Sequence, residues 1–246
     1  MNDAIKMVFV PDNKDIPMTD NITKEIKITC LASVEEAITC MQESGYTICM
    51  SDTAWGGVKL LQDGWYFADR ILYTAINLTG LEIHLPGESR GKYRYVVTDS
   101  WDQEQIYCIA SGFFQKDCRF AIDRDKADET LKNRLLAQYL RRKAAEGCLA
   151  TCCYAGHELA GFNLWSIQEQ KGRVVLGAVQ KKYQNTGLAV YLYNRTICAM
   201  QEKEADTLAD RISAANTASL NLHTRLAQKS GIRFTKAEDW YVKSWS

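Results

Sequence analysis

Residues 174–189 read VVLGAVQKKYQNTGLA, a hydrophobic run followed by a polar loop, a glycine and a second apolar segment. This pattern predicts a β-strand that leads through the loop into a helix. At a helix start the first backbone N–H groups have no partner within the helix, and the helix dipole adds positive potential. An anion can bind at such a point. Gly187 favours a phosphate there, because a residue without a Cβ atom lets the ligand approach the backbone closely.

The neighbouring side chains agree with an anion site, but they also fit a simpler structure. Ala189 keeps the next helical turn narrow, and Lys181 and Lys182 add positive charge at the mouth of the loop. The simpler alternative is an ordinary strand-to-helix turn that Thr186 caps. Two common phosphate-binding loops are excluded. The sequence contains no G-x-x-x-x-G-K-[ST], and no G-x-G-x-x-G follows a predicted strand.

A second group of residues follows the loop in a fixed order. A strand is predicted over residues 206–213, Asn216 opens the next helix, His223 lies within it, and Gly231 and Phe234 come after it. Before this group comes a strand ending at Val179 and a Q-x-x-G-x-A pattern made by Gln184, Asn185, Thr186, Gly187, Leu188 and Ala189. In this order and spacing the sequence resembles the GNAT superfamily of acetyl-CoA-dependent N-acetyltransferases. The resemblance is close over residues 149–243 and loose over residues 1–100.

The resemblance implies where acetyl-CoA, the acyl-donor cosubstrate, would bind. Its pantetheine amides would pair with the backbone of Ala178 and Val179, at the end of the strand. Its pyrophosphate would lie on the N–H groups of residues 184–189, and Asn216 would contact the cosubstrate from the following helix. An amine would attack the thioester directly. Holding the two reactants together would supply most of the acceleration, and an N–H near Val179 would stabilise the oxyanion.

The resemblance also implies the kind of acceptor. The expected product is the N-acetyl derivative of a primary amine on a small molecule, with a nucleotide-linked amino sugar as the preferred acceptor. Within the superfamily the sequence is most similar to the dTDP-fucosamine acetyltransferase type, which carries a degenerate half-copy of the fold before the catalytic domain. The run LLQDGWYFADRILYTAINL and the pair Arg119 and Phe120 carry this finer similarity.

The departing thiolate of coenzyme A needs a proton, and here the sequence departs from the family pattern. The family usually places a tyrosine where this chain has His223. A histidine, with a pKa near 6.5, still carries an N–H at neutral pH and could donate that proton directly or through water. We therefore predict His223 as the catalytic acid. Tyr191, Tyr193 and Tyr241 are the alternatives, and a purely structural hydrogen bond of His223 is another.

The attacking amine must be neutral, so a base or a water chain should remove its proton. Glu158 and Glu169 flank the strands that face the predicted gap, but solvated loop carboxylates fit them equally well. Trp165, Arg119 and Phe120 could line the acceptor pocket, and core packing fits Trp165 and Phe120 as well.

The hydrophobic patterns alternate between strands and helices along the chain. Strands are predicted over residues 25–32, 46–52, 66–78, 93–100, 148–154, 159–168, 173–179, 206–213 and 231–243, and helices over 33–45, 53–63, 101–111, 128–147, 186–204 and 216–229. The order predicts an α/β (α+β) fold with a mixed central sheet and flanking helices. We predict a degenerate GNAT-like half-domain over residues 1–100 and a catalytic GNAT domain over residues 101–246. The helix–glycine–strand order recurs at Gly64 and Gly231, which suggests a weak internal duplication.

Composition narrows the partners and the compartment. The chain has 246 residues, with 30 Lys and Arg against 30 Asp and Glu, so it has no general attraction for nucleic acid or anionic membranes. We expect a small-molecule amine as partner, no nucleic acid and no membrane, and the sequence allows a homodimer. No apolar run approaches the ~20 residues of a membrane helix, and the start of the chain has no signal-peptide core, so a cytoplasmic location is expected.

The cysteines point to neither disulfides nor a metal. Their number, 9, is odd, which favours reduced thiols that pack as small hydrophobic groups. Cys148, Cys152, Cys153 and His157 crowd one predicted strand. Adjacent cysteines of a strand point to opposite faces, so a zinc site is not expected.

Two other functions remain open on the sequence alone. The acceptor could instead be an amino acid, a polyamine or an antibiotic. The protein could also be an acyl-CoA-binding module without turnover, a function that the missing tyrosine favours.

Overall fold

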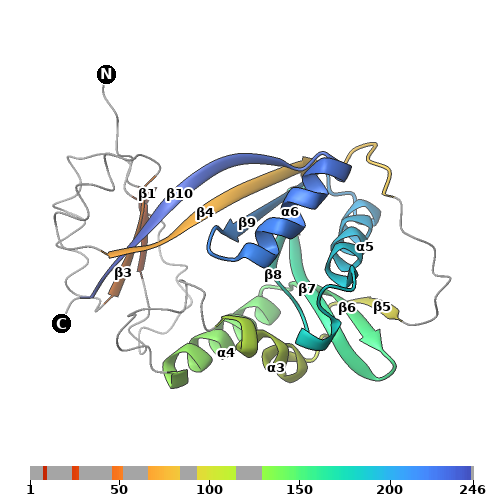
Figure 1. Ribbon diagram of the computed structural model, residues 1–246, viewed down its shortest axis with the longest axis horizontal. Coiled ribbons are helices and arrows are strands. Elements are labelled where there is room, and N and C mark those ends of the chain that lie inside the picture. The colour runs from red at the N-terminus through yellow and green to blue at the C-terminus, as the bar shows by residue number, and fades with distance from the viewer. Residues whose placement is uncertain are drawn as a thin grey trace.

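A ten-stranded mixed sheet joins the parts of the chain that the structure, a computed structural model, describes. These are residues 8–9, 24–27, 46–51, 66–83, 93–114 and 129–244. The strand order is β1-β2-β3-β10-β4-β9-β8-β7-β6-β5, and helices lie on both faces of the sheet (Figure 1). The predicted α/β class with a mixed central sheet and flanking helices is therefore confirmed.

One half of the sheet is an antiparallel meander of β5 (Arg94–Thr98), β6 (Leu149–Ala155), β7 (Glu158–Gln168) and β8 (Lys171–Val179). Gly156, with a φ of 63°, lies in the turn between β6 and β7, where a left-handed backbone is needed. Most of β7 is buried, since helices cover both of its faces. The strands predicted over residues 148–154 and 159–168 are confirmed.

A crossover connects β8 to β9 (Thr207–Ser213), which lies parallel to it. Parallel strands need such a connection, and α5 (Leu188–Glu202) supplies it. α6 (Thr217–Ser230) follows β9. The Asn216 side chain accepts a hydrogen bond of 3.0 Å from the Ser219 N–H and so caps α6, which ends at Gly231 with a φ of 71°.

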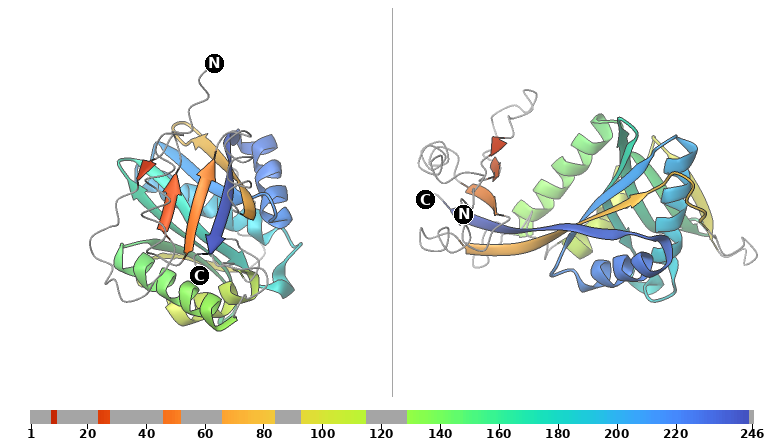
Figure 2. Two further views of the ribbon diagram at one scale, coloured as in Figure 1. Left: turned by 90° about the vertical axis from the view of Figure 1, so that its left-hand side faces the viewer. Right: turned by 90° about the horizontal axis from the view of Figure 1, so that it is seen from above.

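Two hydrophobic cores lie on opposite faces of the sheet. α3 (Gln103–Phe114) and α4 (Glu129–Ala145) cover one face, and α5 and α6 cover the other (Figure 2, right). Asp102 caps α3 by accepting from the N–H groups of Glu104 and Gln105. Cys152 and Cys153 belong to different clusters on the two faces, as strand alternation predicts. Among the described helices, none is long and apolar enough to cross a membrane.

The two longest strands of the described sheet lie side by side at its centre. β4 (Tyr66–Asn77) and β10 (Arg233–Ser244) are both 12 residues long and antiparallel, and β10 also pairs with β3 (Tyr46–Ser51) (Figure 2, left). β4 thus lies between β10 and β9. Strands from residues 1–100 and from residues 101–246 therefore share one sheet, without a break at the predicted domain boundary.

The strands on either side of this central pair are arranged alike. β3 is parallel to β2 (Lys24–Lys27), beyond which lies β1 (Val8–Phe9), just as β9 is parallel to β8. A duplicated chain would produce such an arrangement, although the half-copy itself stays a prediction. The helices predicted over residues 33–45 and 53–63 lie outside the described residues.

Candidate functional site

β8 and β9 separate soon after they begin to pair. Within these two strands the parallel ladder joins three residue pairs, ending at Arg173 and Ala209. The ladder between β7 and β8 is shifted just beyond this point, so that Val175 is an extra residue in β8. Such a bulge bends a strand, and here it turns β8 away from β9. Residues 174–179 of β8 therefore pair with β7 on one edge only, and their other edge has no strand partner among the described residues.

The loop after β8 is held by two glutamine side chains. Gln180 donates from Nε2 to the Leu159 carbonyl at 2.8 Å, and its backbone N–H donates to Ala160 at 2.8 Å. Gln184 donates from Nε2 to the Val179 carbonyl at 3.1 Å. The loop is thus fixed against the end of β8, and Asn185 and Gly187 adopt positive φ values of 61° and 85°.

The N-terminus of α5 is open. Gly187 is the N-cap residue and no side chain caps the helix. Thr186 instead donates from its hydroxyl to the Tyr183 carbonyl at 2.7 Å, so the alternative of a turn capped by Thr186 does not apply. The N–H groups of Leu188, Ala189 and Val190 have no acceptor within the described part of the chain. A Cβ atom built on Gly187 would meet nothing within 4 Å, so free space adjoins these donors.

The cosubstrate residues predicted in β8, in the loop and at the start of α5 are therefore neighbours in space. The free edge of β8 at Ala178 and Val179 runs directly into the fixed loop and the open helix end of residues 184–189. Asn216 lies at the start of α6, and the oxygen of its side chain is occupied in capping that helix.

The charges around the loop are partly neutralised. The Lys182 ammonium lies 2.5 Å from Glu158, and the Tyr183 hydroxyl donates to the same carboxylate at 3.0 Å. The hydrogen bond from Lys182 holds the pKa of Glu158 below its ordinary value. Glu158 is therefore a fixed anion rather than a free base. Glu169, the other predicted carboxylate, lies in the turn before β8, at the opposite end of that strand.

His223 lies at the point where β8 and β9 separate. Its Nδ1 is 2.9 Å from the Ser219 carbonyl and its Nε2 is 3.1 Å from Asp210 Oδ2. Both neighbours accept hydrogen bonds, so both ring nitrogens are suited to carry protons. Burial alone lowers the pKa of His223, but the hydrogen bond and charge of Asp210 outweigh it and raise that pKa. The side chain is 3% exposed, so its contact with Asp210 is buried.

Of the three alternative tyrosines, Tyr193 lies next to this ion pair. Its ring contacts the His223 ring edge-on at 5.2 Å, and its hydroxyl is 3.4 Å from Asp210 Oδ2. The Tyr191 ring lies tilted against the Tyr95 ring of β5, with the ring centroids 4.8 Å apart. Tyr241 is buried against Phe67 in the central strands, away from the separation of β8 and β9.

The predicted acceptor residues are less informative. Trp165 has no exposed surface and donates from Nε1 to the Thr151 hydroxyl at 2.9 Å, so it belongs to the core. Arg119 and Phe120 lie outside the described residues.

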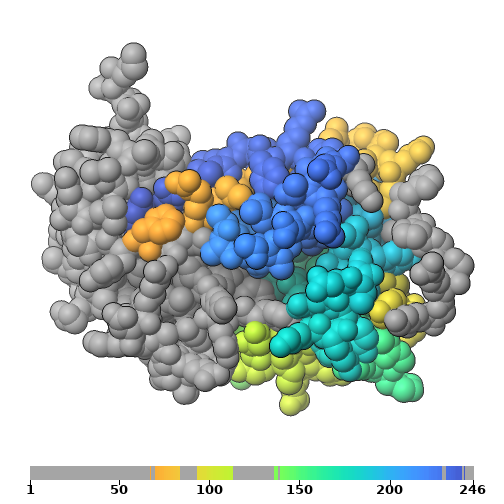
Figure 3. All heavy atoms as spheres, in the orientation of Figure 1, coloured from red at the N-terminus to blue at the C-terminus, as the bar shows by residue number. Residues whose placement is uncertain are grey.

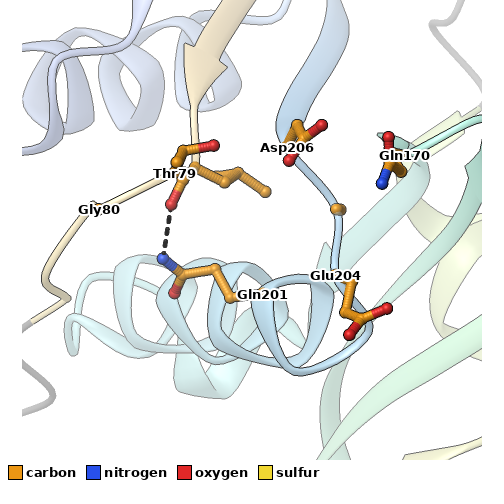
Figure 4. Close-up of a pocket in the computed structure, with 8 residues that line it drawn as sticks. Thr79, Gly80, Gln170, Gln201, Glu204 and Asp206 are labelled. Carbon is orange, nitrogen blue, oxygen red and sulfur yellow. Dashed lines mark hydrogen bonds between the residues drawn. The ribbon is translucent and has the colours of Figure 1, made fainter.

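A hollow of about 510 Å³ lies near the amino end of β8 (Figure 4). Gln201 crosses it and donates to the Leu78 and Leu81 carbonyls at 3.0 and 2.8 Å. The Asp206 N–H donates to Gln170 at 2.8 Å, and the Leu78 N–H donates to Asp206 at 2.7 Å. None of the residues predicted to bind the cosubstrate lines this hollow.

Sequence reasoning missed Asp210. A signal for it existed, because Asp210 shares a strand face with Leu208 and Ile212 in the alternating pattern of residues 206–213. A carboxylate on an otherwise apolar face calls for a partner, and His223 is that partner.

No family model matches the sequence, and no curated protein matches it. Solved structures share its fold. A GCN5-related N-acetyltransferase from Sphaerobacter thermophilus is 14% identical, with a TM-score of 0.60 over 92% of this chain and 74% of its own. A tandem GNAT protein from the clavulanic acid biosynthesis pathway is 10% identical, with a TM-score of 0.60 over 91% and 75%. A glucosamine N-acetyltransferase region of a fungal multi-domain beta-N-acetylglucosaminidase is 9% identical, with a TM-score of 0.62 over 90% of this chain and 29% of that one. The chain therefore has the fold of GNAT N-acetyltransferases.

Proposed function

We propose that the protein is a GNAT-type N-acetyltransferase that moves an acetyl group from acetyl-CoA to a primary amine of a small molecule. The observation that carries this proposal is the continuity of the free β8 edge with the open N-terminus of α5. A backbone edge can pair with the amides of an extended ligand, and bare helix N–H groups bind a diphosphate. Acetyl-CoA contains both parts in this order.

The residues present fit such a ligand. The pantetheine amides pair with Ala178 and Val179, and the pyrophosphate accepts from the N–H groups of residues 184–189. The free space beside Gly187 admits the phosphate oxygens. Asn216 contacts the ligand from the start of α6, with the amide nitrogen of its side chain.

The chemistry that we propose is direct transfer. The neutral amine attacks the thioester carbon and a C–N bond forms, the nitrogen gives up one proton to solvent water, and the C–S bond breaks. His223 supplies the proton that the thiolate takes up, and Asp210 favours the charged imidazole from which it comes. Tyr193 is the second donor within reach of the same carboxylate.

For the acceptor we propose an amino sugar, in the nucleotide-linked form that the dTDP-fucosamine type suggests. The likeness to a glucosamine N-acetyltransferase region supports a sugar amine. The equal numbers of basic and acidic residues give the chain no net charge, which favours a small acceptor over a nucleic acid. We also propose that residues 1–100 derive from a degenerate half-copy of the fold, as the arrangement of β2 and β3 suggests.

A binding module without turnover is the second candidate. The buried ion pair of His223 favours it, because that side chain has 3% of its surface exposed for contact with a ligand. The two functions separate in one experiment, which measures thiol release from acetyl-CoA with a panel of amino sugars, amino acids, polyamines and aminoglycosides. Release with an amine supports the transferase. Tight acetyl-CoA binding in calorimetry without release on any amine supports the module.

A further inference from the structure

Three arginines lie on the face of the sheet opposite α5 and α6, beside the separation of β8 and β9. We call Arg173, Arg211 and Arg233 the basic face. Arg173 is opposite Ala209, Ala209 is opposite Ala75, and Ala75 is opposite Arg233, in a row across four strands. Paired residues of neighbouring strands share a face, and Arg211 shares it because it lies two residues beyond Ala209.

The basic face is open to solvent. All three arginines are exposed, and so is Ala209, although Ala209 lies in an inner strand of the described sheet. Because Ala209 is exposed, none of the described helices covers it. Ala75 and Ala209 have short side chains and lie between Arg173 and Arg233 in this row. On one side α4 limits this area, because the Tyr139 hydroxyl donates to the Val175 carbonyl at 3.2 Å.

The described carboxylates near the arginines are engaged by other groups, since Asp210 pairs with His223. Among the described residues none of the three forms an ion pair with a carboxylate. Glu238 is the buried carboxylate of the neighbouring strand, and it is engaged by Lys236 at 2.5 Å and by the Tyr73 hydroxyl. Burial and the hydrogen bond to Glu238 raise the pKa of Tyr73 to about 12, and the smaller, opposite effect of Arg211 comes from its charge and its hydrogen bond to the Tyr73 side chain. The basic face therefore keeps its positive charge.

Arg173 and Arg211 are close enough to repel each other. They lie on adjacent strands where the ladder between β8 and β9 ends. Burial lowers the pKa of Arg173, and the charge of Arg211 lowers it further. Two like charges beside each other are relieved by an anion between them. Paired guanidinium groups match the oxygens of a phosphoryl group in geometry as well as charge.

The position of the basic face relates it to the proposed reaction. Asp210 and Arg211 are consecutive in β9 and therefore point to opposite faces of the sheet. Asp210 holds His223 on the face covered by α5 and α6, and Arg211 lies on the open face. A thioester placed where β8 and β9 separate would have the proton donor on one face and the arginines on the other.

From this juxtaposition we propose that the basic face binds a phosphoryl group of the amine acceptor. The acceptor is then a phosphorylated or nucleotide-linked amine, approaching from the face opposite α5 and α6. This use of the basic face rests on the proposed acetyl transfer, whereas the phosphoryl site itself does not.

Anion binding can be measured without turnover. The full-length protein is saturated with coenzyme A, so that the α5 N-terminus is occupied, and inorganic pyrophosphate is titrated by calorimetry. We expect binding that weakens with salt and falls by about 10-fold or more in Arg173→Gln and in Arg211→Gln. Arg211→Lys keeps the charge without the paired geometry and should give an intermediate loss. Arg225→Gln on the exposed surface of α6 is the matched control.

Three results would overturn the inference. One is the absence of pyrophosphate binding to the wild type, and another is equal binding in the Arg173→Gln, Arg211→Gln double variant. The third is a loss of coenzyme A affinity in that variant, which would assign the arginines to the cosubstrate. Acetate, titrated in parallel, should bind more weakly than pyrophosphate, and stronger binding of acetate would make the site one for carboxylates.

An activity measurement then tests the role in the acceptor. Glucosamine 6-phosphate should be acetylated with a higher kcat/KM than glucosamine, and the double variant should lose that preference while it still acetylates glucosamine. A wild type that prefers the unphosphorylated amine contradicts the inference and leaves acetyl transfer intact. If none of the amines causes thiol release, the proposed function is contradicted. The pyrophosphate titration then still decides whether the phosphoryl site exists.

Discussion

The two ends of β8 differ in how their polar groups are satisfied. At the amino end, β8 pairs with both β7 and β9, and Gln201 and the Asp206 backbone close the remaining gaps with hydrogen bonds. At the carboxyl end, β9 has turned away and α5 begins without a side-chain cap. Figure 3 shows α5 and α6 together on the outside of this region.

This difference separates structure from function along one strand. Backbone groups that bond within the protein contribute to stability, and their loss destabilises the fold. Backbone groups left without partners at the carboxyl end of β8, the open end, contribute little to stability, but they remain available to a ligand. Substitutions at the amino end should therefore change stability alone, and those at the carboxyl end should change binding.

The largest effect is expected at His223, which lies where β8 and β9 separate. His223→Phe should lower kcat about 10²–10⁴-fold, because the thiolate loses its proton donor. The measurement is the pH–rate profile of the variant beside that of the wild type. A profile of unchanged shape would remove His223 from the mechanism and leave Tyr193 as the donor.

A smaller effect is expected at the open helix end. Gly187→Val should weaken acetyl-CoA binding by about 10–100-fold, because a side chain would occupy the space for the pyrophosphate. Gly156→Val is the matched control, because Gly156 also has a positive φ and free space around it but lies in the β6–β7 turn. Both variants should lose about 1–3 kcal/mol of stability from backbone strain. Equal acetyl-CoA affinities of the two variants in calorimetry would contradict the loop assignment.

Substitutions at the amino end of β8 should change stability and leave acetyl-CoA binding unchanged. Gln201→Leu leaves the Leu78 and Leu81 carbonyls without their donor and should lower the free energy of unfolding by about 1–3 kcal/mol. Acetyl-CoA affinity should not change. Gln180→Leu, which removes a similar bond at the open end, should weaken acetyl-CoA binding instead. If both variants behaved alike in denaturation and in calorimetry, the contrast between the two ends would be wrong.

The smallest effect is a dependence of stability on pH. The folded-state pKa of His223 is raised above its ordinary 6.5. The ion pair with Asp210 therefore stabilises the fold fully below about pH 6.5 and less as the pH rises through the raised pKa. The stability difference between the wild type and Asp210→Asn should be larger near pH 6 than near pH 9. A difference that does not vary with pH would mean that His223 is neutral.

Local signals made much of this predictable from sequence. Among the described residues the hydrophobic periodicity located the strands and helices, and the Q-x-x-G-x-A pattern located the loop and the helix start. Asn216 as the cap of α6 follows from its place before a helical pattern. These features depend on neighbouring residues in the chain, so the amino-acid sequence is sufficient to predict them.

Features that depend on distant pairing were not predictable. The bulge at Val175, which opens the gap between β8 and β9, is defined only by the register with β7. The place of β4 between β9 and β10 joins residues far apart in the sequence. The basic face arises from the registers of four strands, so nothing local connects Arg173 with Arg233. His223 could be named from its position, and the place of Asp210 on an apolar strand face signals a buried carboxylate but does not say which residue it pairs with.

A crystal structure with bound coenzyme A tests the central claim most directly. We predict the diphosphate within hydrogen-bonding distance of the backbone N–H groups between Gln184 and Ala189, and the pantetheine chain along the free edge of β8. Coenzyme A bound at another place, or not bound at all, would contradict the account and the enzyme that it describes.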